Sequence, residues 1–250
     1  MLIHRGLTLD EILRLHQEWL ESGGMAGVRA DLRDADLSGA ELDGANLAKA
    51  RLQGMLLVEA SLCQAILSGA QMQGSNLTEA RLNGANLSHA VLSDGNLMRA
   101  NLMEAVLLEA DLRRCSLRYA RLAMTKLAGA DLTEARLDHA DLHQADLFKA
   151  RLRDTGLTGA NFRGADLGLA DLAGAQLKQA NLGLANLSGA ILRSAQFDSA
   201  QLTRANGHGT NLQGARHLTP KQLTTLLTNE ETVLPDGTRG PYRATVSGRR

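Results

Sequence analysis

Leucine or another apolar residue recurs at every fifth position between residues 30 and 215. The repeat comprises 37 consecutive five-residue units without an insertion, and the central position is apolar in every unit except that of Gly207. Alanine usually stands two positions before the central residue, as in Ala35-Asp-Leu. Self-similarity at a short fixed period is typical of a solenoid. The pattern therefore predicts one elongated repeat body.

A five-residue period does not suit an α-helix. Leucines five residues apart would step about 140° around a helix and would form no apolar face. In a strand, residues two apart share a face, so each alanine and its following leucine point inward together. The next alanine is three residues further on, which requires a bend in every unit. Residues such as Ser38 and Gly39 suit tight turns, so each unit is expected to be a short strand and a corner.

Units such as Ala35-Asp-Leu-Ser-Gly and Ala185-Asn-Leu-Ser-Gly resemble those of the pentapeptide-repeat proteins, whose repeat is A(D/N)LXX. The resemblance covers about three quarters of the chain. It implies an all-β solenoid, a right-handed quadrilateral β-helix with four units per coil. The 37 units would then form about nine coils and, at roughly 4.8 Å per coil, a rod on the order of 45 Å long.

A helix is predicted on each side of the repeat. Thr8 to Leu20 is amphipathic, and Thr8 with Glu11 predicts a capping box. Thr219-Pro220 predicts the start of a second helix, through about Asn229. The open end of a solenoid exposes strand edges and an apolar column, so each helix is expected to cap one end.

Trp19, the only tryptophan, shares its helical stripe with leucines, which favours an anchor of the cap over a partner hot spot. The predicted segments are an amino-terminal helical cap (1–29), the repeat (30–216), a carboxyl-terminal helical cap with an extended piece (217–240) and a flexible tail (241–250).

Charge and cysteine content exclude several classes of function. The chain has 27 basic and 27 acidic residues, so its net charge gives no argument for nucleic-acid or membrane binding. Cys63 and Cys115 lie several coils apart, too far for a disulfide, which favours a reduced, cytoplasmic protein. Neither cysteine has a CxxC partner, and the histidines lack metal-ligand spacing. We expect no metal, no cofactor and no enzymatic activity, because a uniform rod provides no catalytic pocket.

Outward apolar residues form a candidate contact site. By their phase in the repeat, Val106, Leu108 and Phe148 fall on one face. Met103 and Met124 lie across the adjoining corner, and Ile66 lies further along the face. A contiguous exposed apolar patch marks a contact site, whereas isolated residues need no explanation. The alternatives are scattered variation and an interface, either with a heterologous protein or in a homodimer.

Basic residues gather in the coil from residue 111 to 130. This coil contains Arg113, Arg114, Arg118, Arg121 and Lys126 against Asp111 alone. These side chains spread over different faces, and only Tyr119 could stack on a base, so no direct nucleic-acid binding is expected. The alternatives are a partner-binding belt and an ordinary solvated surface.

These observations predict a non-enzymatic, bacterial, cytoplasmic module for protein interaction or regulation. The family resemblance implies one alternative, since some pentapeptide-repeat proteins mimic DNA, bind DNA gyrase or topoisomerase IV and confer resistance to quinolones or toxins. A DNA mimic needs a continuous acidic surface, which the basic belt interrupts. The chain also lacks the loop insertions of the plasmid-borne resistance proteins.

Overall fold

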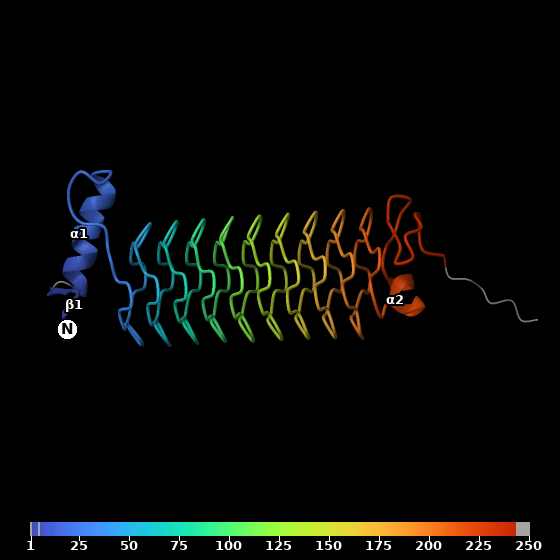
Figure 1. Cartoon of the computed structure of the whole chain (residues 1–250), viewed down its shortest axis with the longest axis horizontal. Helices are drawn as coiled ribbons and strands as arrows, with labels where there is room; N and C mark the ends of the chain where they lie inside the picture. The colour runs from blue at the N-terminus through green and yellow to red at the C-terminus, as the bar shows by residue number, and fades with distance from the viewer. Residues whose placement is uncertain (1, 5, 244–250) are drawn as a thin grey trace, which may run out of the picture.

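The computed structural model describes residues 2–4 and 6–243, with the side chains of residues 6–243. Strands β1 (Leu2–His4) and β2 (Leu7–Thr8) form an antiparallel hairpin, and helix α1 (Leu9–Glu21) follows. The repeat then extends as a long rod, and helix α2 (Pro220–Thr225) lies at its far end (Figure 1). Residues 244–250, most of the predicted tail, lie outside the described residues.

Parallel bridges between residues twenty positions apart hold the coils together, as between Asp31 and Arg51. The Leu32 N–H donates to the Arg51 carbonyl at 2.8 Å, and the Arg51 N–H donates to the Ala30 carbonyl at 2.9 Å. Each unit contributes a single bridge rather than an extended strand. Because the offset is twenty residues, the chain returns to the same face after four units. The predicted β-helical solenoid is confirmed.

A tight turn follows every central residue. In the first unit the Ala35 N–H donates to the Leu32 carbonyl at 3.2 Å, and Asp34, the third residue of the turn, has a φ of 58°. This third position has a positive φ in all 37 units, at 13 glycines and 24 other residues. Positive φ at this position is typical of a type II turn and costs a non-glycine residue about 1 kcal/mol. The repeat therefore imposes this conformation even where the residue disfavours it.

The interior consists of stacked alanine and leucine columns, which are buried from Leu47 through Ala205. The buried threonines and the cysteine in alanine positions donate to carbonyls of the preceding coil, whereas the Ser75 hydroxyl donates to the Met72 carbonyl of its own turn at 2.7 Å. Thr125 Oγ1 lies 3.0 Å from the Leu102 oxygen, and Cys115 Sγ lies 2.9 Å from the Leu92 oxygen. Burial raises the pKa of the Cys115 thiol to about 12, so this thiol is inert at neutral pH.

At the amino-terminal end, α1 begins with the predicted capping box. The Thr8 hydroxyl accepts from the Glu11 N–H at 3.3 Å, and the Glu11 carboxylate accepts from the Thr8 N–H at 2.8 Å. Trp19 is half-buried and stacks on His16, with ring centroids 5.6 Å apart. Arg29 approaches the Trp19 ring to 5.8 Å, so the indole lies within the contacts of the cap.

At the other end, α2 ends at Thr225 and not at the predicted position near Asn229. Leu226 adopts an extended conformation, with ψ of 132°, because the chain here rejoins the coil. A Cβ on Gly207 would lie 2.9 Å from Leu226 Cγ, so Leu226 occupies the space of the missing central leucine. Further on, Leu227 pairs with Asn206, and Val233 pairs with Asn211. The carboxyl-terminal segment thus continues the hydrogen-bonded ladder, although its sequence no longer follows the five-residue repeat.

Candidate interaction surface

The second turn positions of one face form the centre of the candidate surface. The Glu109 N–H donates to the Ala128 carbonyl at 3.1 Å, and the Gly129 N–H donates to the Phe148 carbonyl at 2.9 Å. These bonds stack Leu108, Ala128 and Phe148 in one column. Leu108 is 37% exposed and Phe148 38%. The turns of three successive coils therefore present these two large apolar side chains to solvent.

The apolar column continues beyond Phe148. A Cβ on Gly168 would lie 3.2 Å from Phe148 Cδ2, and a Cβ on Gly189 would lie 2.6 Å from Leu169 Cδ2. Phe148 and Leu169 therefore each lie over a glycine of the next coil. Ile191 follows Gly189 by two residues. We call the group formed by Leu108, Phe148, Leu169 and Ile191 the apolar ridge.

Leu169 and Ile191 were not predicted from the sequence, although they are 50% and 38% exposed. The signal was present in the repeat, because residues 149, 169 and 189 occupy the same turn position in successive coils. Comparing the third turn positions as well as the second turn positions would have placed Leu169 next to Phe148.

The other predicted apolar residues are less closely grouped. Val106 is half-buried, and Asn86 lies between it and Ile66 in the ladder. Met103 accepts a contact from an Arg121 guanidinium nitrogen at 3.0 Å, so its sulfur is partly covered. Met124 is 40% exposed at the third position of its turn. Leu108 and Phe148 thus share one turn column, whereas Val106, Met103, Met124 and Ile66 occupy other positions of the repeat.

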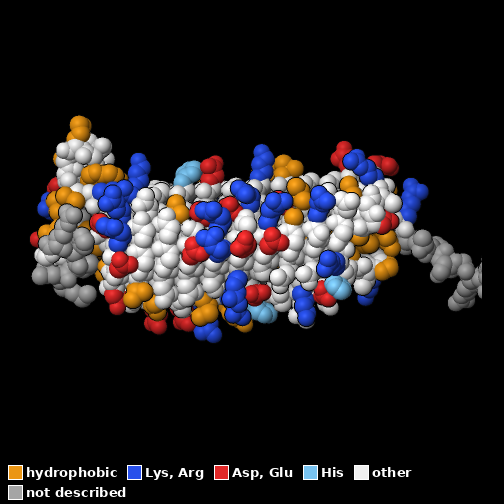
Figure 2. All heavy atoms as spheres, in the orientation of Figure 1, with side chains coloured by type: hydrophobic (Ala, Val, Ile, Leu, Met, Phe, Trp, Pro, Cys, Tyr) orange, Lys and Arg blue, Asp and Glu red, His pale blue; other side chains and the backbone are white. Residues whose placement is uncertain are grey.

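The predicted basic belt is largely paired with carboxylates. Arg113 lies 2.6 Å from Asp111, and Arg114 lies 2.7 Å from Asp94 of the preceding coil. Hydrogen bonds from these arginines lower the pKa of both Asp94 and Asp111. Arg118 lies 3.7 Å from an Asp138 oxygen. Figure 2 shows the result, with acidic and basic side chains interleaved along the middle of the rod.

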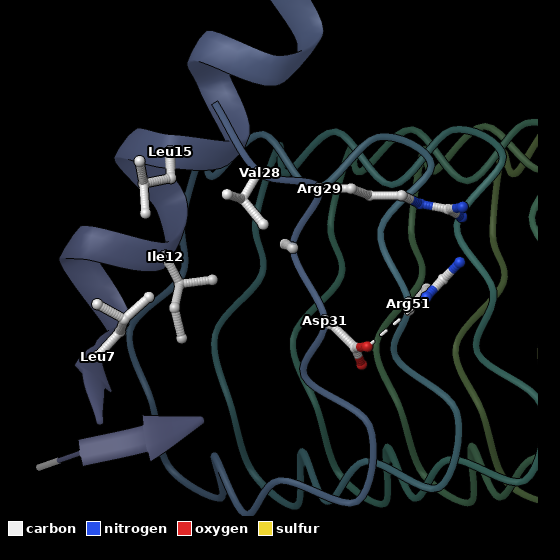
Figure 3. A pocket seen from close by; sticks show the side chains of 8 residues that line it. Leu7, Ile12, Leu15, Val28, Arg29, Asp31 and Arg51 are labelled. Carbon is white, nitrogen blue, oxygen red and sulfur yellow. Dashed lines mark ion pairs between the residues drawn. The ribbon is translucent and has the colours of Figure 1, made fainter. Parts of the chain in front are cut away.

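A cavity of about 230 Å³ lies between α1 and the first coil (Figure 3). Leu7, Ile12, Leu15 and Val28 form its apolar wall. The charged residues of its lining, Arg29, Asp31 and Arg51, belong to the start of the rod, and Asp31 lies 3.8 Å from Arg51. In Figure 3 the two arginine side chains extend along the rod, away from the leucines. The cavity is thus a gap beneath the cap, with no polar groups converging on its apolar part among the side chains drawn.

The described residues contain no group of three or more His, Cys, Asp or Glu side chains that could hold a metal ion. None of their helices is both long and apolar enough to cross a bilayer.

A β-helical solenoid with variable outward columns defines a class of repeat proteins, and the comparisons identify the family. Eight copies of the pentapeptide-repeat model match, spanning residues 28–216. The chain belongs to the pentapeptide-repeat family, whose fold is a right-handed β-helix and whose members are generally structural or interaction modules.

Several solved structures are similar to the chain. It is 32% identical to HetL, a pentapeptide-repeat protein involved in heterocyst differentiation regulation from the cyanobacterium Nostoc sp. strain PCC 7120; the match covers 93% of this chain and 99% of HetL, with a TM-score of 0.47. A trypsin-treated variant of QnrB1, a plasmid-mediated fluoroquinolone resistance protein, is 15% identical, with coverages of 81% and 92% and a TM-score of 0.42. Rfr23 from the cyanobacterium Cyanothece 51142 is 22% identical, with coverages of 69% and 93% and a TM-score of 0.20. No curated protein matches the chain.

Proposed function

We propose that this chain is a non-enzymatic interaction module that binds a protein partner through the apolar ridge. The supporting observation is that Phe148 packs over Gly168, the residue before the exposed Leu169, while the exposed Leu108 stands in the Phe148 column two coils earlier. Large apolar side chains that are exposed next to one another mark contact sites, whereas single ones do not. A second copy of this chain is one candidate partner, and a heterologous protein is the other.

The backbone beneath the ridge is rigid, which favours binding. Every turn that presents a ridge residue is hydrogen-bonded to the next coil, as in the 2.9 Å bond from the Lys149 N–H to the Gly168 carbonyl. Charged groups lie beside the ridge, including Asp146, which accepts from the Phe148 N–H at 3.0 Å, and Lys149, which lies 5.2 Å from the Phe148 ring. An apolar centre with a charged rim on a fixed backbone loses little entropy on association.

The alternative of a gyrase-binding DNA mimic has no comparable supporting observation. A mimic would present a continuous row of carboxylates, but those of Asp94, Asp111 and Asp138 are paired with arginines. Such pairs remove the excess negative charge that would imitate a phosphate backbone.

The proposal is tested with a matched pair of double variants. Phe148→Arg with Leu169→Arg places two charges in the ridge, at residues that are 38% and 50% exposed. Leu56→Arg with Leu227→Arg adds the same charges outside the ridge, at residues that are 39% and 51% exposed. The ridge variant is expected to lose at least tenfold in the amount of partner that it captures, since a buried unpaired charge is costly at an interface, while the control variant behaves as wild type.

Light scattering on the same three proteins tells a homodimer from a complex with another protein. If the ridge variant retains both the captured partners and the mass of the wild type, the ridge is not the binding site.

A further inference from the structure

His16 of α1 is fully buried against the first coil. Its Nε2 lies 3.0 Å from the Ala48 carbonyl oxygen, and the Ala30 N–H donates to its Nδ1 at 3.1 Å. A carbonyl can only accept and an amide N–H can only donate. The two partners therefore require a neutral imidazole with its single proton on Nε2.

The surroundings of His16 disfavour a positive charge. Burial lowers its pKa, and the nearby Arg29 lowers it further, while the bond to Ala48 acts in the opposite direction and is outweighed. Lys49, which follows Ala48, is a second cation on the elements that pack against the ring. Asp31, next to Ala30, is bound by Arg33 at 2.7 Å.

A proton on Nδ1 would point at the Ala30 N–H and would break that hydrogen bond. Among the described residues, α1 makes other polar contacts with the rest of the chain, but none of them comes from a buried side chain. Asn46 donates to Gln17 at 3.1 Å at the surface, and the Val28 N–H donates to the Leu15 carbonyl at 3.0 Å. The two bonds of His16 are thus the buried polar link between α1 and the coil.

We propose that His16 is a pH-sensitive latch, which holds α1 on the rod when it is neutral and releases it when it is protonated. Release would uncover the end of the inward columns, where Ala35, Ala40 and Leu37 lie. It would also free the outer edge of the first coil, an unpaired strand edge of the kind that other chains can extend.

The direction of the effect follows from proton linkage. The pKa of His16 is lowered in the closed state, so the open state binds the proton more tightly. The latch is therefore fully effective above the ordinary histidine pKa of about 6.5. Its contribution falls as the pH drops from that value through the lowered pKa. Within this window one bound proton favours opening about tenfold per pH unit.

Hydrogen–deuterium exchange of the full chain tests the latch, after correction for the intrinsic pH dependence of exchange. In wild type, opening at α1 and at the Ala30 amide should rise about tenfold per pH unit below about pH 6.5, relative to mid-rod amides such as Leu127. His16→Gln, which does not titrate, should abolish this slope. His208→Gln, at an exposed histidine near the other end, should retain it.

An NMR titration of the His16 ring in wild type keeps the test decisive if the His16→Gln cap fails to close. The ring should titrate with the same midpoint as the opening of α1. A wild-type α1 that stays protected while His16 takes up its proton would overturn the latch, as would a slope that persists in His16→Gln.

Discussion

The two ends of the rod are closed in different ways. At the amino-terminal end a helix lies across the coil, and the buried link is the imidazole of His16 (Figure 1). At the carboxyl-terminal end Gln222 performs a similar task with an amide, since its Nε2 donates to the carbonyls of Phe197 and Ala200, both at 2.9 Å. An amide does not titrate, so only the first of these links depends on pH.

The ends also differ in how completely they cover the core. Ala35, Ala40 and Ala45 of the first coil are all half-buried, whereas near the other end Ala200 and Ala205 are buried and only the last alanine, Ala215, is half-buried. The cause is the backbone: residues 227 and 233 extend the ladder, although their offsets of 21 and 22 residues depart from the twenty-residue register, but α1 contributes no bridge to the first coil among the described residues. A helix laid across a coil closes it less completely than a continued ladder does.

The largest effect is expected from deleting the two linking side chains. His16→Ala leaves the buried Ala30 N–H and the Ala48 carbonyl without partners and creates a cavity, so it should destabilise the closed amino-terminal end by about 3 kcal/mol. Gln222→Ala should cost its end only about 1 kcal/mol, because the Phe197 carbonyl still accepts from the Ala200 N–H at 3.0 Å. Hydrogen exchange at α1 and at Leu227 measures both effects. Equal losses would contradict the proposed difference between the ends.

A smaller and symmetric effect is expected at the two capping boxes. The hydroxyls of Thr8 and Thr219 accept from the N–H groups of Glu11 and Gln222 at 3.3 and 3.2 Å. Thr8→Ala and Thr219→Ala should each destabilise the local helix by about 1 kcal/mol, and serine at either position should restore most of the loss. Exchange rates of the first-turn amides report the change. Serine variants as unstable as the alanine variants would show that the hydroxyl is not the cause.

The smallest effect is expected from relieving backbone strain at each end. Lys49 and Arg204 both have a φ of 58°. Glycine at either position should raise the free energy of unfolding by about 0.5 kcal/mol, because the lost strain slightly exceeds the added entropy of the unfolded chain. Denaturant titration measures the change. Gly69→Ala, at a φ of 64°, is the reverse control and should destabilise the rod; a loss of stability in both glycine variants would argue against strain in the turn.

The repeat itself was predictable from the sequence, because the inward alanine and leucine positions follow one period without interruption. The end of α2 was not predictable. The helix stops at Thr225 because Leu226 leaves the helical conformation and packs into the space at Gly207. That contact joins residues that are distant in the pattern. Helical periodicity alone could not reveal it.

The candidate sites were predictable only in part. The exposure of Leu108 and Phe148 on one face could be predicted from their positions in the twenty-residue coil. Leu169 could have been predicted in the same way from the neighbouring turn position. His16 lies in the predicted apolar stripe of α1, but its importance depends on which backbone groups meet its two ring nitrogens. Positive φ at residues such as Asp34 was hidden as well, because the ladder overrides the preference of the residue.

The twenty-residue register limits how such a chain can change in length during evolution. A duplication or deletion of twenty residues would lengthen or shorten the rod by one coil and leave every later column on its original face. An insertion of five residues would keep the alanine and leucine columns intact but move all later residues to the next face. The ridge beyond such an insertion would then no longer align with Leu108. Binding surfaces in this family can therefore be broken and rebuilt by small insertions that leave the core unharmed.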